Sequence, residues 1–169
     1  MGWLLNNKPK KSQASSKSGF VLSLKGRALR LLSSREQSRV ELERKLSSHE
    51  EEPGQLAAVL DELEAKDFIS QARVVESVIN RRAAKFGASR IKRELLGKGL
   101  DGEAVHDAVE QLKNSELERL QLVWQRKFGT PASDAAGQAR QMRFLLTRGF
   151  SADAVRSVLR SARQRPADD

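Results

Sequence analysis

Residues 94–105, ELLGKGLDGEAV, place a lysine between two glycines. This arrangement raises the question of whether the stretch is a phosphate-binding loop. A Walker A loop needs G-x-x-x-x-G-K-[ST], because backbone N–H groups cradle the phosphates and the hydroxyl holds magnesium. Lys98 follows Gly97 but precedes Gly99, so that hydroxyl is missing. The stretch is therefore better interpreted as a joint between two helices than as a nucleotide site.

Residues suited to catalysis or metal binding are few. The chain has two histidines and neither cysteine nor tyrosine. His49 heads an acidic HEEE run, and Glu103-x-x-His106 resembles half of a carboxylate di-metal motif. That site needs a second Glu-x-x-His and two further glutamates, and the sequence offers no second copy. Glu103, His106, Asp107 and Glu110 are expected to form an exposed polar face. We expect no enzymatic activity, no metal and no cofactor.

Positive charge is the main chemical feature of the chain. The net charge of +9 favours an anionic partner, such as nucleic acid or an acidic protein surface. Residues 81–98 carry seven Lys or Arg against Glu94 alone, whereas residues 41–67 hold nine acids and three bases. Two interpretations of residues 81–98 stay open. They form either a solvated helix face or an anion-contacting ridge with i, i+3 and i, i+4 pairs.

The elements that must position these residues are helices, because apolar residues recur at helical spacing and sustained period-2 alternation is absent. The cap signals predict about nine helices of about 10–16 residues. A Ser-x-x-Glu capping box is expected at Ser38–Glu41 and again at Ser115–Glu118. Further expected helix starts are Pro53, Ser70, Ser89, Asp101 and Ser151.

An internal repeat is visible when residues 92–109 are placed over residues 142–159. Leu95-Leu96 meets Leu145-Leu146, and Lys98-Gly99 meets Arg148-Gly149. A glycine just past a helix end adopts the left-handed conformation without a Cβ clash, so each glycine is predicted to close a helix. Residues 38–46 form a weaker first copy.

The repeat predicts an all-α fold of three tandem three-helix repeats, and the family resemblance given below implies that this array is elongated. We place a flexible basic tail at 1–19 and repeats at 20–69, 70–114 and 115–165. The core of the second repeat is expected to hold Val75, Ile79, Phe86, Ile91, Leu95, Val105, Val109 and Leu112. In the tail, Trp3 is either a docking element or an incidental aromatic. No apolar run approaches the roughly 20 residues that span a membrane, so we expect a cytoplasmic protein without a membrane partner.

The sequence resembles the RecX family, bacterial regulators of the RecA recombinase, over roughly residues 27–162. The resemblance rests on RALRLLSSREQSRVELERKL, AKDFISQARVVESVI, KFGASRIKREL-x2-KGL and MRFLLTRGF, in this order. Two positions depart from the family pattern. Lys85 stands where a glycine usually precedes Phe86-Gly87, and Asp67 stands where a glycine is common.

The resemblance implies a protein that binds the RecA filament along its groove and inhibits ATP hydrolysis, filament extension and strand exchange. We expect it to be a monomer. Such a protein acts in DNA recombination, DNA repair and the SOS response. Weak contact with single- or double-stranded DNA is a further expectation, and a direct DNA-binding helical module is the alternative function. The basic positions that match the family's middle and last units are the expected RecA or DNA contacts: Arg81, Lys85, Arg90, Arg93, Lys98, Arg143 and Arg148.

Overall fold

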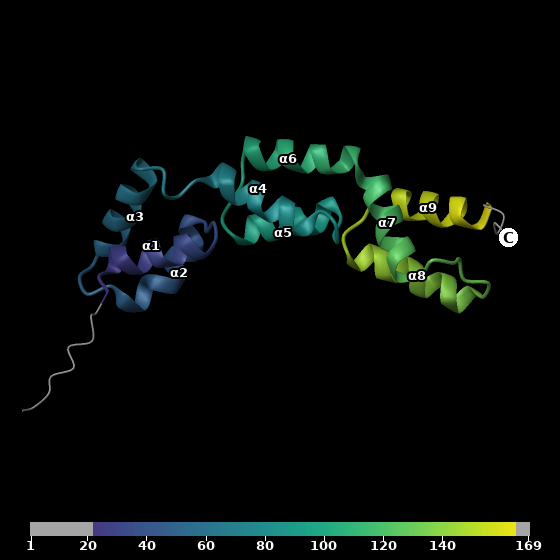
Figure 1. Ribbon diagram of the computed structural model, residues 1–169, viewed down its shortest axis with the longest axis horizontal. Helices are drawn as coiled ribbons and strands as arrows, with labels where there is room; N and C mark the ends of the chain where they lie inside the picture. The colour runs from purple at the N-terminus through teal and green to yellow at the C-terminus, as the bar shows by residue number, and fades with distance from the viewer. Residues whose placement is uncertain (1–21, 165–169) are drawn as a thin grey trace, which may run out of the picture.

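The computed structural model describes residues 22–164, which form nine α-helices, one short 3-10 helix and no strand. The helices lie in three consecutive groups along an elongated molecule (Figure 1). We refer to α1–α3 as unit 1, α4–α6 as unit 2 and α7–α9 as unit 3. The predicted all-α array of three three-helix repeats is confirmed. The helices are α1 Leu24–Ser34, α2 Arg39–Leu46, η1 Ser47–His49, α3 Gln55–Ala65, α4 Gln71–Arg82, α5 Ala88–Gly97, α6 Glu103–Asn114, α7 Glu116–Lys127, α8 Ala135–Thr147 and α9 Ala152–Gln164.

Each unit buries an apolar cluster of its own, because one amphipathic face of each helix is turned toward the other two. In unit 2 the predicted core is largely correct: six of its eight residues are buried, while Ile79 and Phe86 pack against the cluster and stay partly exposed. Unit 3 is built around Trp124, with Phe128 at its edge. The predicted tail, residues 1–19, and Trp3 lie outside the described residues.

The two glycine joints have the predicted geometry. Gly99 has φ +71° and Gly149 has φ +85°, so each ends its helix in the left-handed region that favours glycine. The leucine four residues before each glycine, Leu95 or Leu145, is completely buried. The residue after the glycine, Leu100 or Phe150, turns back into the core of its unit.

Some predicted helix starts are correct and others are wrong. Ser38 forms the full capping box with Glu41, and Ser70 and Ser151 accept from backbone N–H groups as N-caps. Ser89 lies inside α5 and donates its hydroxyl elsewhere, and Ser115 precedes α7 without a capping bond. Asp101 precedes the actual N-cap, Gly102.

The start of α3 also differs from the prediction at Pro53. The helix begins at Gln55, after Gly54 with φ +86°. The Glu50 carboxylate accepts from the N–H groups of Gly54 and Leu56, at 2.9 and 3.1 Å. The start is therefore capped by a side chain from the preceding loop, which helical spacing does not reveal.

The two departures from the family pattern have different outcomes. Asp67 has φ +57° and is the one described non-glycine residue with positive φ, so the chain keeps the left-handed turn with an aspartate, which tolerates it better than most residues do. Its carboxylate and carbonyl both accept from Arg73, at 2.8 and 2.6 Å. Lys85 does not have a positive φ, so a lysine is accommodated there without backbone strain.

Candidate functional site

Cations and aromatic rings alternate where unit 2 meets unit 3. The Cζ atoms of Arg90, Arg148 and Arg82 lie 4.3, 5.6 and 5.7 Å from the centroid of the Phe86 ring. Arg148 also lies 4.3 Å from the Phe144 centroid. A guanidinium over an aromatic face is attracted by the ring quadrupole. We call this group the basic joint, made of Arg82, Lys85, Phe86, Arg90, Phe144 and Arg148.

Hydrogen bonds to backbone carbonyls hold the basic joint together. Arg90 Nη1 donates to Thr147 O at 3.2 Å, and Arg148 Nη1 donates to Lys85 O at 3.1 Å. The N–H of Gly87 donates to Arg148 O at 2.9 Å. The loop before α5 and the end of α8 are thus tied together by side chains from both units.

The basic joint carries excess positive charge. Arg82 forms an ion pair with Glu94 at 3.0 Å. Within residues 22–164, Lys85, Arg90 and Arg148 have no carboxylate within ion-pair distance. The guanidinium groups of Arg90 and Arg148 therefore meet over one ring without an ion-paired acid among the described residues.

Arg119 also stabilises the boundary between units 2 and 3, through hydrogen bonds to backbone carbonyls. Its guanidinium donates to the carbonyls of Ala83, Phe86 and Leu112 at 2.9, 2.8 and 2.6 Å, and its Nε donates to Ser115 Oγ. Burial lowers the pKa of Arg119, and the nearby Glu116 carboxylate opposes that shift. Arg119 fastens α7 to unit 2 and has few donors left for a ligand.

Lys98 lies at the other boundary, between units 1 and 2, and its charge is neutralised. Its Nζ lies 2.6 Å from Glu41 Oε1, and 14% of its side chain is exposed. Burial raises the pKa of Glu41, but hydrogen bonds from Arg35 and Lys98 outweigh it and lower the pKa to about 2. Lys98 thus joins two units, and contact with a partner stays a prediction for it.

The remaining predicted contacts lie on exposed surface. Arg81 and Arg93 each direct Nε to a carbonyl four residues earlier in their own helix, Ser77 O and Ser89 O. Arg143 is exposed on α8. The structure therefore brings Arg90 and Arg148 together over the Phe86 ring, with Lys85 in the adjoining loop, and leaves Arg81, Arg93 and Arg143 exposed on α4, α5 and α8.

Four residues of this region, Arg82 among them, are not among the contacts predicted from the sequence. Phe86 was assigned to the core, and Phe144 and Arg119 were not selected. The spacing of Phe144 and Arg148, i and i+4 on one helix, was a usable signal for a cation over a ring. No sequence signal pointed to Arg119, because its guanidinium donates to backbone carbonyls of another unit.

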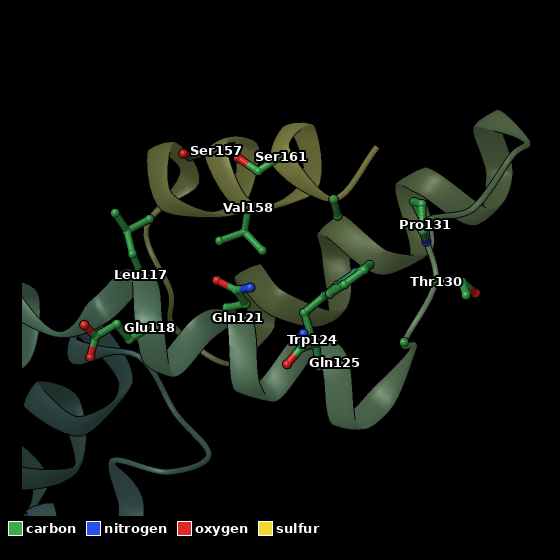
Figure 2. Close-up of a pocket in the computed structure, with 12 residues that line it drawn as sticks. Leu117, Glu118, Gln121, Trp124, Gln125, Thr130, Pro131, Ser157, Val158 and Ser161 are labelled. Carbon is green, nitrogen blue, oxygen red and sulfur yellow. The ribbon is translucent and has the colours of Figure 1, made fainter. Parts of the chain in front are cut away.

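An open groove of about 500 Å³ runs between α7, α9 and residues 129–131 of unit 3 (Figure 2). Leu117 and Trp124 from α7 and Val158 from α9 line it, and Glu118 is its one charged lining residue. Within residues 22–164 no cluster of three or more His, Cys, Asp or Glu is placed to hold a metal ion. Glu103, His106, Asp107 and Glu110 are all exposed on α6. No helix in this part of the chain is long and apolar enough to cross a membrane.

Comparison with known proteins shows which family the chain resembles. Residues 25–63 match the family model of the first three-helix domain of RecX, and residues 114–159 match that of the third. Regulatory protein RecX of Leptothrix cholodnii is 54% identical over 141 residues, covering 83% of this chain and 90% of that protein. Regulatory protein RecX of Herminiimonas arsenicoxydans is 51% identical over 140 residues, covering 83% and 93%.

Solved structures show the same fold. The crystal structure of RecX from Lactobacillus salivarius has a TM-score of 0.69 and 22% identity, covering 84% of this chain and 96% of that one. A second crystal structure of regulatory protein RecX has a TM-score of 0.66 and 18% identity, covering 80% and 70%. With both the repeated fold and the sequence matched over most of its length, the chain belongs to the RecX family of regulatory proteins.

Proposed function

We propose that this protein binds the RecA nucleoprotein filament along its groove and restrains ATP hydrolysis, filament extension and strand exchange. The observation that carries the proposal is 54% identity to a regulatory protein RecX over 83% of the chain. We propose further that it acts as a cytoplasmic monomer. Light scattering of the purified protein tests that oligomeric state.

The shape and charge of the molecule are consistent with this role. An array of repeats presents an extended surface, which suits a long polymeric partner better than a compact one. Arg90 and Arg148 at the basic joint, together with the exposed Arg81, Arg93 and Arg143 on α4, α5 and α8, put positive charge on units 2 and 3, which suits an anionic partner.

The decisive experiment assembles RecA on single-stranded DNA, adds this protein and follows ATP hydrolysis. The expected result is a dose-dependent fall in hydrolysis while the filament still exchanges subunits. Hydrolysis that does not change at a molar excess would rule out the proposed role.

Charge reversal tests which surface makes the contact. Changing Arg81, Lys85, Arg90 and Arg93 together to Glu is expected to abolish binding to the filament, with helicity by circular dichroism retained. Because Arg90 also bridges two units, a second variant reverses only Arg81, Lys85 and Arg93. The matched control reverses three exposed cations elsewhere, Arg30, Arg44 and Arg126. Equal affinity of the triple variant and the control would assign residues 81–93 to solvation alone.

Direct DNA binding is the second candidate, favoured by the net charge of +9. It predicts retention of bare DNA with a steep dependence on salt, because phosphate contacts release condensed counterions. If no binding is detected at about 50 mM salt, where such contacts are strongest, this candidate is removed.

A further inference from the structure

The groove in unit 3 leaves apolar surface exposed at the edge of a buried core. Leu117 on α7 is 52% exposed, and it lies on the groove wall with Trp124 of the same helix and Val158 of α9 (Figure 2). Glu118, the one charged lining residue, forms no ion pair within residues 22–164. A ligand that matches this groove is therefore apolar, with positive charge beside its apolar part.

The shape of the groove is fixed by buried hydrogen bonds. Trp124 Nε1 donates to Gln141 Oε1 at 3.1 Å, and Gln141 Nε2 donates to the carbonyl of Thr130 at 2.9 Å. Gln141 is buried, so these bonds are shielded from water and hold residues 129–131 against α7. The groove is thus formed before a ligand arrives, which lowers the entropic cost of binding.

A matching segment occurs in residues 1–21, outside the described part of the chain. Residues 3–5 are Trp, Leu and Leu, and Lys8, Lys10 and Lys11 follow them. No Asp or Glu occurs in the same stretch. The segment therefore combines an apolar group with uncompensated positive charge, as the groove requires.

We propose that this groove binds residues 3–5 of a second copy of the chain and so joins copies head to tail. The apolar side chains of the segment cover the groove wall around Leu117 and remove it from water. An aromatic residue supplies much apolar area in one side chain, so Trp3 is the main contact. The lysines that follow it offset the charge of Glu118.

The length of the intervening chain favours a second copy over the same molecule. The segment is joined to unit 1, which lies at the opposite end of the elongated molecule from unit 3 (Figure 1). Leu5 and Leu22 are 22 − 5 = 17 residues apart. A polar chain of 17 residues that is not held by packing has an end-to-end distance of about 21–25 Å. The 12-residue helix α6 of unit 2 alone is about 18 Å long. To reach its own groove, the segment has to stretch past the whole of unit 2, at a cost in entropy.

The segment and the groove are different surfaces, so the contact is heterologous and copies can be added in series. For an apolar ligand of three residues, a dissociation constant of about 100 µM is expected. The dilute protein therefore stays a monomer, whereas copies that lie next to one another on a long partner associate through their high local concentration. That use on a filament rests on the proposed function, but the contact itself does not require RecA.

The first experiment titrates a fluorescein-labelled peptide of residues 1–12 with a full-length segment variant, Trp3→Ser with Leu4→Ser and Leu5→Ser. This variant keeps the groove but cannot fill it with its own segment. Adding Leu117→Gln to it is expected to weaken peptide binding about fivefold. The matched control is Leu122→Gln, because Leu122 is 59% exposed on the same helix but does not line the groove. If the peptide does not bind, or if Leu117→Gln weakens binding no more than Leu122→Gln does, the site is overturned.

A second peptide tests whether the apolar residues or the lysines drive binding. It carries the three serine substitutions of the segment variant and keeps every lysine. It is expected to bind about tenfold more weakly than the first peptide. Equal binding of the two peptides would overturn the apolar contact in favour of attraction by charge alone.

Sedimentation equilibrium from about 10 µM to about 1 mM, around the expected dissociation constant, separates docking between copies from docking within one molecule. The mass of the parent is expected to rise past that of a dimer, because each added copy brings another empty groove. Leu117→Arg with Glu118→Arg makes the groove repel the basic segment. This groove variant and the segment variant are each expected to stay monomeric, and their equimolar mixture to stop at a dimer. A parent that stays monomeric at concentrations where the mixture forms dimers would overturn the head-to-tail contact, because each segment would then occupy its own groove.

Discussion

The hydroxyl of Ser89 donates a 2.7 Å hydrogen bond to the carbonyl oxygen of Gly149, sixty residues further along the chain. Ser38 makes the corresponding 2.6 Å bond to the carbonyl of Lys98, also sixty residues away. In both cases the serine lies near the start of the second helix of one unit, and the carbonyl belongs to the glycine joint of the next. The glycine joint therefore ends a helix and also docks its unit onto the preceding one.

The first prediction concerns the close approach at these joints. A Cβ atom on Gly149 would lie 2.5 Å from Arg90 Cβ and 2.7 Å from Arg90 N, at a φ of +85°. Gly149→Ala is therefore expected to cost about 2–4 kcal/mol of unfolding free energy, since both strain and a backbone clash oppose it.

The matched control is Gly97→Ala, because Gly97 ends α5 with nothing within 4 Å of its would-be Cβ and no positive φ. Urea denaturation should find this variant as stable as the parent or up to about 1 kcal/mol more stable, given the helix propensities of the two residues. Equal stability of the two alanine variants would show that the close approach at Gly149 is unimportant.

The second prediction follows from the pKa of Glu41, which is about 2 in the folded chain and ordinarily 4.5. A depressed folded pKa adds stability that is fully present above pH 4.5 and is lost as the pH falls toward 2. After allowance for solvent screening, we expect the ion pairs of Glu41 with Arg35 and Lys98 to contribute about 1–2 kcal/mol to the unfolding free energy at pH 7. Denaturation of the parent and of Glu41→Gln between pH 7 and pH 3 measures this contribution, and the difference in stability between the two should narrow on acidification. A difference that does not depend on pH would contradict the assignment.

The third prediction concerns Arg119, whose guanidinium serves three carbonyls at the boundary of units 2 and 3. Arg119→Met keeps much of the apolar stem but leaves those acceptors without their donor, at a cost of about 2–3 kcal/mol. Arg93→Met, on an exposed side chain, should change stability by less than about 0.5 kcal/mol. Thermal melts followed by circular dichroism compare the two. If they melt alike, Arg119 does not hold the boundary.

The fourth prediction uses two adjacent leucines at the end of α5. Leu95 is fully buried, whereas Leu96 is 48% exposed. Leu95→Ala is expected to lose about 2–5 kcal/mol through lost burial and a cavity, and Leu96→Ala well under 1 kcal/mol. Chemical denaturation of both variants checks which face of α5 is turned toward the core. A larger loss of stability for Leu96→Ala than for Leu95→Ala would show that the opposite face is buried.

Local patterns were enough to predict the helices and their repetition. Apolar spacing of 3.6 residues and the paired Lys-Gly and Arg-Gly joints depend on backbone geometry within a few residues. The number of helices now seen in residues 22–164 and the burial of Leu95 could therefore be predicted from the sequence alone. Helix starts were less predictable. Ser89 donates to a carbonyl sixty residues away instead of capping its own helix, and the start of α3 is capped by Glu50 from the preceding loop.

Sequence order also showed where positive charge is concentrated, but it could not show which cations are neutralised. Lys98 and Arg148 occupy the same place in their repeats, yet Lys98 meets Glu41 from unit 1 while Arg148 meets Phe86 and Phe144. Electrostatic interaction depends on distance in space, and these partners lie up to 62 residues apart in the chain. The tertiary structure alone decided that Lys98 joins two units as an ion pair and that Arg148 meets two aromatic rings with no carboxylate of residues 22–164 within ion-pair distance.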